Sequence, residues 1–183
     1  DVTIRELTQT LRGSPYLLLI ALLSLFFLAP INIPGLSVPA GIFLSLFGIR
    51  LTFGQKPFIP KSIAKLKLSK KFFPPVLNAT SSLLKGIEFF SRPRWAFLTD
   101  KGLLMNFYGF IIFLAAIMLA LPFPLGNYLP SLTLLFISLG IIERDGLFIL
   151  LGLIFFLLSG AFFAFVFLGG FQLLNWAVEK STT

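Results

Sequence analysis

The segment "LPFPLGNYLPSLTLLFISLGIIERDG", residues 121–146, interrupts a long apolar part of the chain. It opens on Pro-x-Pro followed by Gly126, and it closes on the charged run Glu-Arg-Asp. Proline has no backbone N–H and clashes with the preceding helical turn, so a helix must break at the opening. In hydrocarbon, such a break is tolerated only where it is buried in protein or faces water. The segment therefore predicts a broken helix inside a membrane protein.

The composition supports a membrane protein. The 183 residues are 57% hydrophobic and 12% charged, and the mean hydropathy is +0.96. A soluble domain is nearer one half apolar and about one quarter charged. The apolar residues fall in five blocks with almost no charge, at 15–29, 39–53, 103–121, 128–142 and 146–171.

The block lengths set the predicted architecture. Because about 20 apolar residues are needed to cross a bilayer, only the third and fifth blocks are long enough to span one alone. We expect one all-α integral membrane domain over 1–183. It would comprise a first hydrophobic repeat (1–53), a basic segment (54–101), and a second repeat with a C-terminal spanning helix (102–183).

Several classes of chemistry are excluded by residue type. The chain has no cysteine and no histidine, so neither a thiolate nucleophile nor the usual metal ligands and proton shuttle are present. An acid–base pair would have to use Glu143 and Asp145, whose position beside Arg144 suits a salt bridge better. We expect no enzymatic activity, no metal and no cofactor. Residues 1–14 lack a small-residue cleavage site, so we expect no signal peptide.

The net charge of +8 is unevenly distributed. Eleven of the fifteen basic residues lie between Arg50 and Lys101. Basic residues flanking membrane segments stay on the cytoplasmic side, so we expect a multi-pass inner-membrane protein with 54–101 in the cytoplasm. This segment would form amphipathic interfacial helices on anionic headgroups, or else a solvated linker. Nucleic acid is not an expected partner.

Two parts of the chain share a pattern. "PINIPGLSVPAGIFLSLFGIR" (30–50) and "PFPLGNYLPSLTLLFISLGIIER" (122–144) each contain a proline-rich break, a glycine, and a proline four positions later. We interpret this as an internal duplication, an inverted repeat of two broken helical hairpins that are re-entrant. The alternative is a tight surface loop between two thin spanning helices. The residues that make the breaks are Pro34, Gly35, Pro39, Pro124, Gly126 and Pro130.

Polar residues near the breaks are candidates for substrate binding. Asn32 and Ser37 lie at the first break, and Asn127, Ser131 and Thr133 lie at the second. Free N–H groups where the following helices start carry partial positive charge and can receive an anion. The alternative for the hydroxyls is bonding to helix carbonyls, and for Asn127 it is a plain turn.

Charged residues after the breaks complete the candidate set. Arg50 closes the first repeat, and Glu143, Arg144 and Asp145 close the second. Both arginines have long stems and a planar fork suited to phosphate, so they can act as matched anion-attracting groups. The alternatives are that both arginines anchor helix ends at the headgroups and that 143–145 is an interfacial turn.

The stretches "INIPGLSVPAGIFLSLFGIRLTFGQKPFIPKSI" and "LPFPLGNYLPSLTLLFISLGIIERDGLFILLG" resemble the ExoD family of bacterial membrane proteins. The resemblance covers nearly the whole chain and implies an inner-membrane protein linked to exopolysaccharide synthesis and to tolerance of alkaline conditions. The family has no settled catalytic residues to carry over. The layout of paired broken hairpins is also similar to DedA-type proteins, which handle a phosphorylated lipid carrier, although likeness of architecture is a weak basis for function.

These observations predict a small transporter or lipid-carrier translocase that supports exopolysaccharide synthesis. The expected substrate is anionic, either a polyprenyl phosphate or a small anion. The alternative is a non-transporting accessory subunit that holds a polysaccharide synthesis complex in the membrane. Because about five short helices are few for a sealed pathway, we expect a homodimer.

Overall fold

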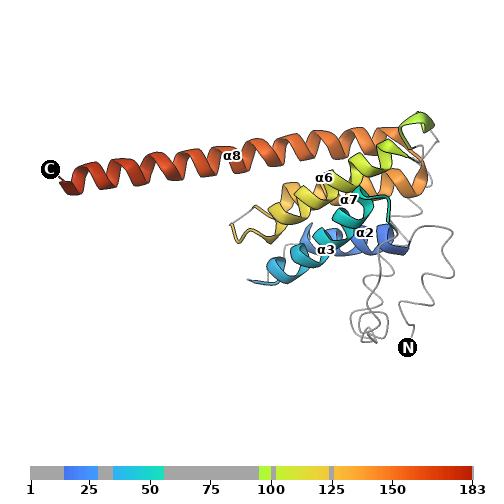
Figure 1. Ribbon diagram of the computed structural model, residues 1–183, viewed down its shortest axis with the longest axis horizontal. Coiled ribbons are helices and arrows are strands. Elements are labelled where there is room, and N and C mark those ends of the chain that lie inside the picture. Colours follow the sequence, from blue (N-terminus) through green and yellow to red (C-terminus); the bar gives the residue numbers. More distant parts are fainter. Residues whose placement is uncertain (1–14, 29–34, 56–94, 100–101, 124–125, 183) are drawn as a thin grey trace.

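The computed structural model describes residues 15–28, 35–55, 95–99, 102–123 and 126–182. Every regular element in these ranges is helical (Figure 1). The elements are α2 (Pro15–Leu28), α3 (Ser37–Thr52), the short 3-10 helix η1 (Ala96–Thr99), α6 (Leu103–Ala120), α7 (Tyr128–Glu143) and α8 (Gly146–Thr182). The all-α prediction is confirmed for this part of the chain, and each apolar block predicted from the sequence coincides with one helix.

The helices lie side by side and alternate in direction along the chain (Figure 1). In space, α3 packs mainly on α6, while α7 packs on both α8 and α2. Because the helices alternate in direction, α2 and α6 finish at the end of the bundle where α3 and α7 begin (Figure 1). We call this the break end. The opposite end holds the α7–α8 turn and η1, and we call it the turn end.

The closest packing is between α3 and α6, and glycine makes it possible. A Cβ on Gly41 would lie 2.6 Å from the carbonyl oxygen of Ala116, and Gly48 lies against the backbone of Phe113 in the same way. Gly109 of α6 meets the backbone of α3 at Thr52. Membrane helices associate through small residues of this kind, because small residues let the two backbones approach closely.

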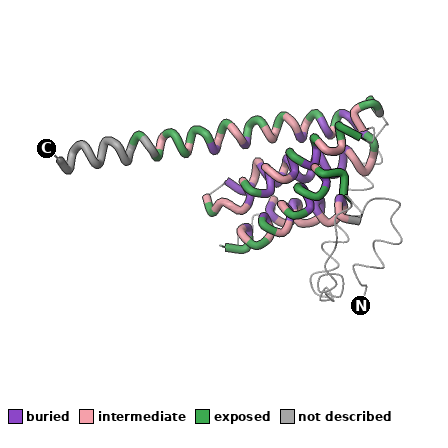
Figure 2. The backbone as a smooth tube through the Cα atoms, in the orientation of Figure 1, coloured by how far each residue is buried: buried purple, intermediate pink, exposed green. Residues whose placement is uncertain are grey.

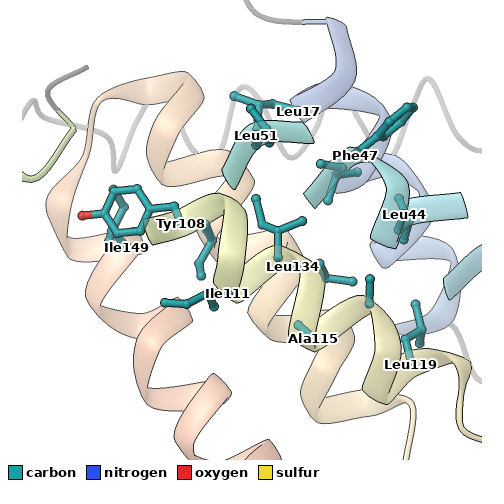
Figure 3. Packing of buried hydrophobic residues seen from close by; sticks show 14 of the residues in the cluster. Leu17, Leu44, Phe47, Leu51, Tyr108, Ile111, Ala115, Leu119, Leu134 and Ile149 are labelled. Atoms are coloured by element: carbon teal, nitrogen blue, oxygen red, sulfur yellow. The ribbon is translucent and has the colours of Figure 1, made fainter. Parts of the chain in front are cut away.

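All five long helices contribute to one apolar core, which lies at the centre of the bundle (Figures 2 and 3). Leu44 of α3, Ile112 of α6, Leu134 of α7 and Ile149 of α8 are each fully buried, as is Ile20 of α2. Each helix buries one face against the others. The packing of these faces therefore determines where the helix ends beside the two breaks lie relative to one another.

Helix α8 differs from the others because it extends far past the bundle (Figure 1). Its apolar part, Gly146–Gly170, and helix α6 are each long and apolar enough to cross a membrane. Exposed large apolar residues follow α8 along much of its length, among them Leu150, Ile154, Leu157, Leu158, Phe165, Phe167 and Leu168. Soluble monomers rarely expose apolar patches of this extent. The helices fit a membrane protein.

The prolines after the breaks stand where the sequence predicts. Pro39 is the third residue of α3 and Pro130 is the third residue of α7. A first-turn proline loses no intrahelical bond, because the first four N–H groups have no partner in the helix. The described parts of the two breaks therefore start their helices in the same way.

One expectation is corrected. Helices α2 and α6 run in the same direction, and α3 and α7 both run in the opposite one (Figure 1). Two halves related by inversion in the membrane would run in opposite directions, so the expected inverted repeat is wrong for the described helices. The predicted amphipathic helices of the basic segment lie at 56–94, outside the described residues, as do Asn32, Pro34 and Pro124.

Candidate functional site

Polar side chains are buried at the break end. Ser37 is 5% exposed at the start of α3, and Asn127 is 8% exposed at the start of α7. Ser131, one turn into α7, has no exposed surface. Asn127 occupies the N-cap position, yet its backbone is helical (φ −79°, ψ −23°) and its side chain makes no capping hydrogen bond. An asparagine at this position usually accepts a bond from the first turn, so its side chain here is left for another use.

Most described hydroxyls bond to their own helix. The hydroxyls that donate to a carbonyl three or four residues earlier are those of Ser24, Ser45, Thr52, Thr133 and Ser138. For Thr133 this means the Oγ1 lies 3.1 Å from the carbonyl oxygen of Leu129. The hydroxyl of Thr133 therefore bonds to a carbonyl of its own helix, which is the alternative to substrate binding given above for the hydroxyls near the breaks.

Three buried atoms depart from this pattern. Among the described residues, the Oδ1 of Asn127 and the Oγ atoms of Ser131 and Ser159 are buried without a hydrogen-bond partner. Leaving a buried polar atom unpaired costs about 1–3 kcal/mol. Native proteins pair most such groups, so an exception calls for a functional explanation or for a bound molecule.

Two of these atoms share one face of α7. Asn127 and Ser131 are four residues apart, which places them about 40° apart around the helix axis. Ser138 lies on the same face two turns deeper and is equally buried, but its hydroxyl donates to Leu134 at 2.6 Å. On this face of α7, the unpaired polar atoms of the described residues therefore lie only in the first turns, at the break end.

Ser159 is a residue that the sequence analysis missed. Close contacts of Gly140 with Ile149, and of Gly152 with Ile137, show that α7 and α8 pack antiparallel. In this register Ser159 lies at the level of Pro130, near the start of α7. Ser159 lies against the side of α7 that packs on α8, whereas Ser131 is on the opposite side of α7. The available signal was that Ser159 is the sole hydroxyl residue in the apolar block 146–171.

The glycines of the two breaks have different requirements. Gly35 has φ +84°, a left-handed conformation that L side chains rarely adopt, although a Cβ there would meet nothing. Gly126 is buried, and a Cβ on it would lie 3.0 Å from the Cβ of Phe123. Thus a conformational need explains Gly35, and close packing beside Asn127 explains Gly126.

The charged candidates lie at the other end of the molecule. Arg50 is exposed in the last turn of α3, and Arg144 is exposed just after α7. Along a helix, Arg144 is about 20 Å from Ser131 and about 26 Å from Asn127 at 1.5 Å per residue. A single small ligand cannot touch both groups. The structure therefore divides the predicted site into two parts.

The turn from α7 to α8 shows what Arg144 and Asp145 do structurally. Arg144 has φ 55°, left-handed, at the position where glycine usually ends a helix. Asp145 is 1% exposed and its Oδ1 accepts a bond from the N–H of Leu147 at 2.9 Å. Asp145 is therefore the N-cap of α8. Glu143, half-buried in the last turn of α7, lies beside them.

Exposed aromatic residues gather at the turn end. Trp95 and Phe97 flank the start of η1 and are 53% and 64% exposed. The Cβ of Trp95 packs against Gly146 at the start of α8, and the hydroxyl of Tyr108 donates to the carbonyl of Leu98 at 2.7 Å. Aromatic rings beside exposed arginines are typical of a membrane–water interface.

Comparison with known proteins agrees with this description. The protein family described as "Exopolysaccharide synthesis, ExoD" matches residues 1–165. "Protein ExoD" of Rhizobium meliloti (strain 1021) is 36% identical over 166 residues, which cover 89% of this chain and 69% of that protein. An uncharacterized protein of Synechocystis sp. is 29% identical over 144 residues, covering 78% of this chain and 68% of the relative.

No solved structure matches this chain. The family match covers most of the described helices, including the break end, the turn end and the unpaired polar atoms of α7 and α8. The family description names exopolysaccharide synthesis as the process. This chain belongs to the ExoD family of exopolysaccharide-synthesis proteins.

Proposed function

We propose that the protein is a multi-pass inner-membrane transporter or lipid-carrier translocase that supports exopolysaccharide synthesis. The observation that carries this proposal is the pair of buried, unpartnered polar groups on Asn127 and Ser131. A scaffold helix has no need of such groups, whereas a site that holds a polar substrate does. Apolar residues of similar size would stabilise the bundle more.

The depth of the break end supports a re-entrant arrangement. Phe123, beside the second break, packs edge-on against Phe163 of α8, with ring centroids 5.8 Å apart. Phe163 is about 26 Å along α8 from Gly146 at 1.5 Å per residue. The apolar part of α8 continues to Gly170, about 10 Å further. With the turn end at one membrane surface, the break end would lie about 26 Å in, a few ångströms short of the far side of a hydrocarbon core of about 30 Å.

The packing of the helices supports an internal duplication, with both copies pointing the same way. Helix α2 packs on α7, and α6 packs on α3. If α2 and α3 of the first half are exchanged for α6 and α7 of the second, the pair α2–α7 becomes the pair α6–α3. The third-position prolines, Pro39 and Pro130, follow the same correspondence. We therefore propose two parallel hairpins, a revised form of the DedA-like layout.

The turn end supports contact with anionic headgroups. Arg50 and Arg144 are both exposed at this end, as are the rings of Trp95 and Phe97. A polyprenyl phosphate or other anion would be held at this end, on the cytoplasmic side if the basic residues of 54–101 set the orientation. A homodimer through the exposed face of α8 belongs to the same proposal.

Complementation of a strain that lacks the protein tests the proposal. Asn127→Leu and Ser131→Ala remove the unpartnered groups while keeping an apolar helix. We expect each to lower exopolysaccharide output several-fold at matched expression, because a substrate contact is lost. Ser138→Ala is the matched control, since its hydroxyl is already bonded within the helix, and we expect normal output.

The accessory role predicts a different outcome. A subunit that only holds a complex in the membrane should tolerate Asn127→Leu and Ser131→Ala as well as it tolerates Ser138→Ala. Normal output from all three variants would reject translocation through the break end and favour the accessory role.

A further inference from the structure

We infer that Asn127 and Ser131 bind an uncharged, hydroxyl-bearing group, such as the face of a sugar, rather than a phosphate. This inference rests on the proposed function and names the class of ligand for its site. It differs from the anionic substrate expected from the sequence, which rested on the free N–H groups after the breaks and on arginines that reach back along their helices.

The distribution of charge is the first argument. Of the charged residues in the described ranges, Arg50, Glu143, Arg144 and Asp145 are at the turn end. Glu179 and Lys180 are in the last turns of α8, sixteen or more residues beyond Phe163. No described residue therefore supplies a full positive charge to the first turns of α7.

The described residues would compensate a phosphate at this position poorly. The N-terminus of α7 offers only about half an elementary charge. Burying a charged group away from water is very costly unless it is paired with an opposite charge. An uncharged ligand avoids this cost and needs only hydrogen-bonding partners.

The hydrogen-bonding capacity of the site is the second argument. The Oδ1 of Asn127 is an unpartnered acceptor, and the same amide carries an NH2 that can donate. The Ser131 hydroxyl can both donate and accept. A ligand hydroxyl matches both groups because it donates and accepts as well. A fully ionised phosphate has acceptors alone, so it would use the donors of Asn127 and Ser131 and none of their acceptor capacity.

The first turn of α7 adds donors of the right kind. The N–H groups of Tyr128 and Leu129 have no carbonyl partner within the helix, and Pro130 has no N–H. The face near Asn127 thus combines the start of a helix with one amide and one hydroxyl. Several hydroxyls on neighbouring carbons, as in a sugar ring, would use this mixture more fully than a single water molecule.

Direct binding by the full chain tests the inference. The probe is radiolabelled octyl β-glucoside below its micelle concentration, added to protein in phosphatidylcholine nanodiscs. Unlabelled octyl phosphate, free glucose and sodium chloride serve as competitors. We expect saturable binding that octyl phosphate and sodium chloride do not displace. Asn127→Leu and Ser131→Ala should each raise Kd about tenfold, the loss of one hydrogen bond, and Ser138→Ala should leave Kd unchanged.

The outcomes separate the possible errors. Displacement of the bound glucoside by octyl phosphate would overturn the ligand class and leave the proposed function standing if complementation still needs Ser131. Displacement by sodium chloride would indicate a cation site instead and also overturn it. Absence of saturable binding, or an equal loss in Ser138→Ala, would reject the site. With saturable binding, competition by free glucose would identify a free sugar as ligand, and its absence would identify a lipid-linked one.

Discussion

The buried polar residues at the two ends of α7 differ in whether their side chains have hydrogen-bond partners. At the turn end, Asp145 is buried and its carboxylate caps α8. At the break end, Asn127 is nearly as buried but its Oδ1 has no partner. One end uses a polar side chain to stabilise the fold, and the other keeps polar groups that the fold does not use. Burial alone therefore does not distinguish a structural residue from a binding one, whereas hydrogen-bond partners do.

The largest effect is expected midway between the two ends. Gly48→Leu would force a side chain into the backbone of Phe113, where a single Cβ already has no room. Overpacking of this kind costs about 1–3 kcal/mol or more. We expect loss of folded protein in the membrane, measured by blotting and by size-exclusion chromatography. Ile42→Leu, on the exposed face of α3, is the control and should keep normal amounts. Normal folding of Gly48→Leu would contradict the close α3–α6 packing.

Removing the cap at the turn end should have a smaller effect. Asp145→Ala leaves the N–H of Leu147 unpaired, and loss of an N-cap typically costs about 0.5–2 kcal/mol. We expect a lower Tm, but exopolysaccharide output per folded molecule should not change. Asp145→Asn should retain most of the stability because its side-chain oxygen can still accept. A loss of output in Asp145→Asn at full stability would instead make Asp145 a binding residue.

Changes at Arg144 should move stability and function in different directions. Arg144 has a left-handed backbone conformation, which costs a residue other than glycine about 1 kcal/mol. Arg144→Gly removes this cost, so we expect a higher Tm. Arg144→Lys keeps the charge but loses the planar fork. If Arg144 binds phosphate, the lysine variant should lower output several-fold in complementation, as should Arg50→Lys. Full output from both lysine variants would leave the arginines as interfacial anchors.

The sequence predicted the helices well because their cause is local. Apolar blocks bounded by Pro39, Gly126 and the charged run at 143–145 leave few choices for helix ends, and the observed bounds follow them closely except at the end of α8, which continues past the apolar block to Thr182. The direction of the halves was not predictable in this way. It depends on α3 packing antiparallel to α6, a long-range choice that the pattern of each half does not contain.

The candidate site was predicted in part. Proximity in sequence to the breaks singled out Ser131 and Asn127, which are both buried, and their role in binding stays a prediction. It also grouped them with Arg50 and Arg144, which a helix of 16 residues carries to the opposite end. Ser159 could not be linked to α7 at all, because only the antiparallel register of α7 and α8 brings it to that level.

The most direct test of the contrast between the two ends uses the absence of native cysteine. Ser131→Cys and Ser138→Cys would each be the sole thiol in the chain. Both positions are fully buried on the same face of α7, so simple burial predicts equal, negligible reaction with a small methanethiosulfonate reagent. Our account predicts that Ser131→Cys reacts much faster, because the break end admits polar ligands, and that octyl β-glucoside slows this reaction. Equal rates at the two positions would contradict a ligand site at the break end.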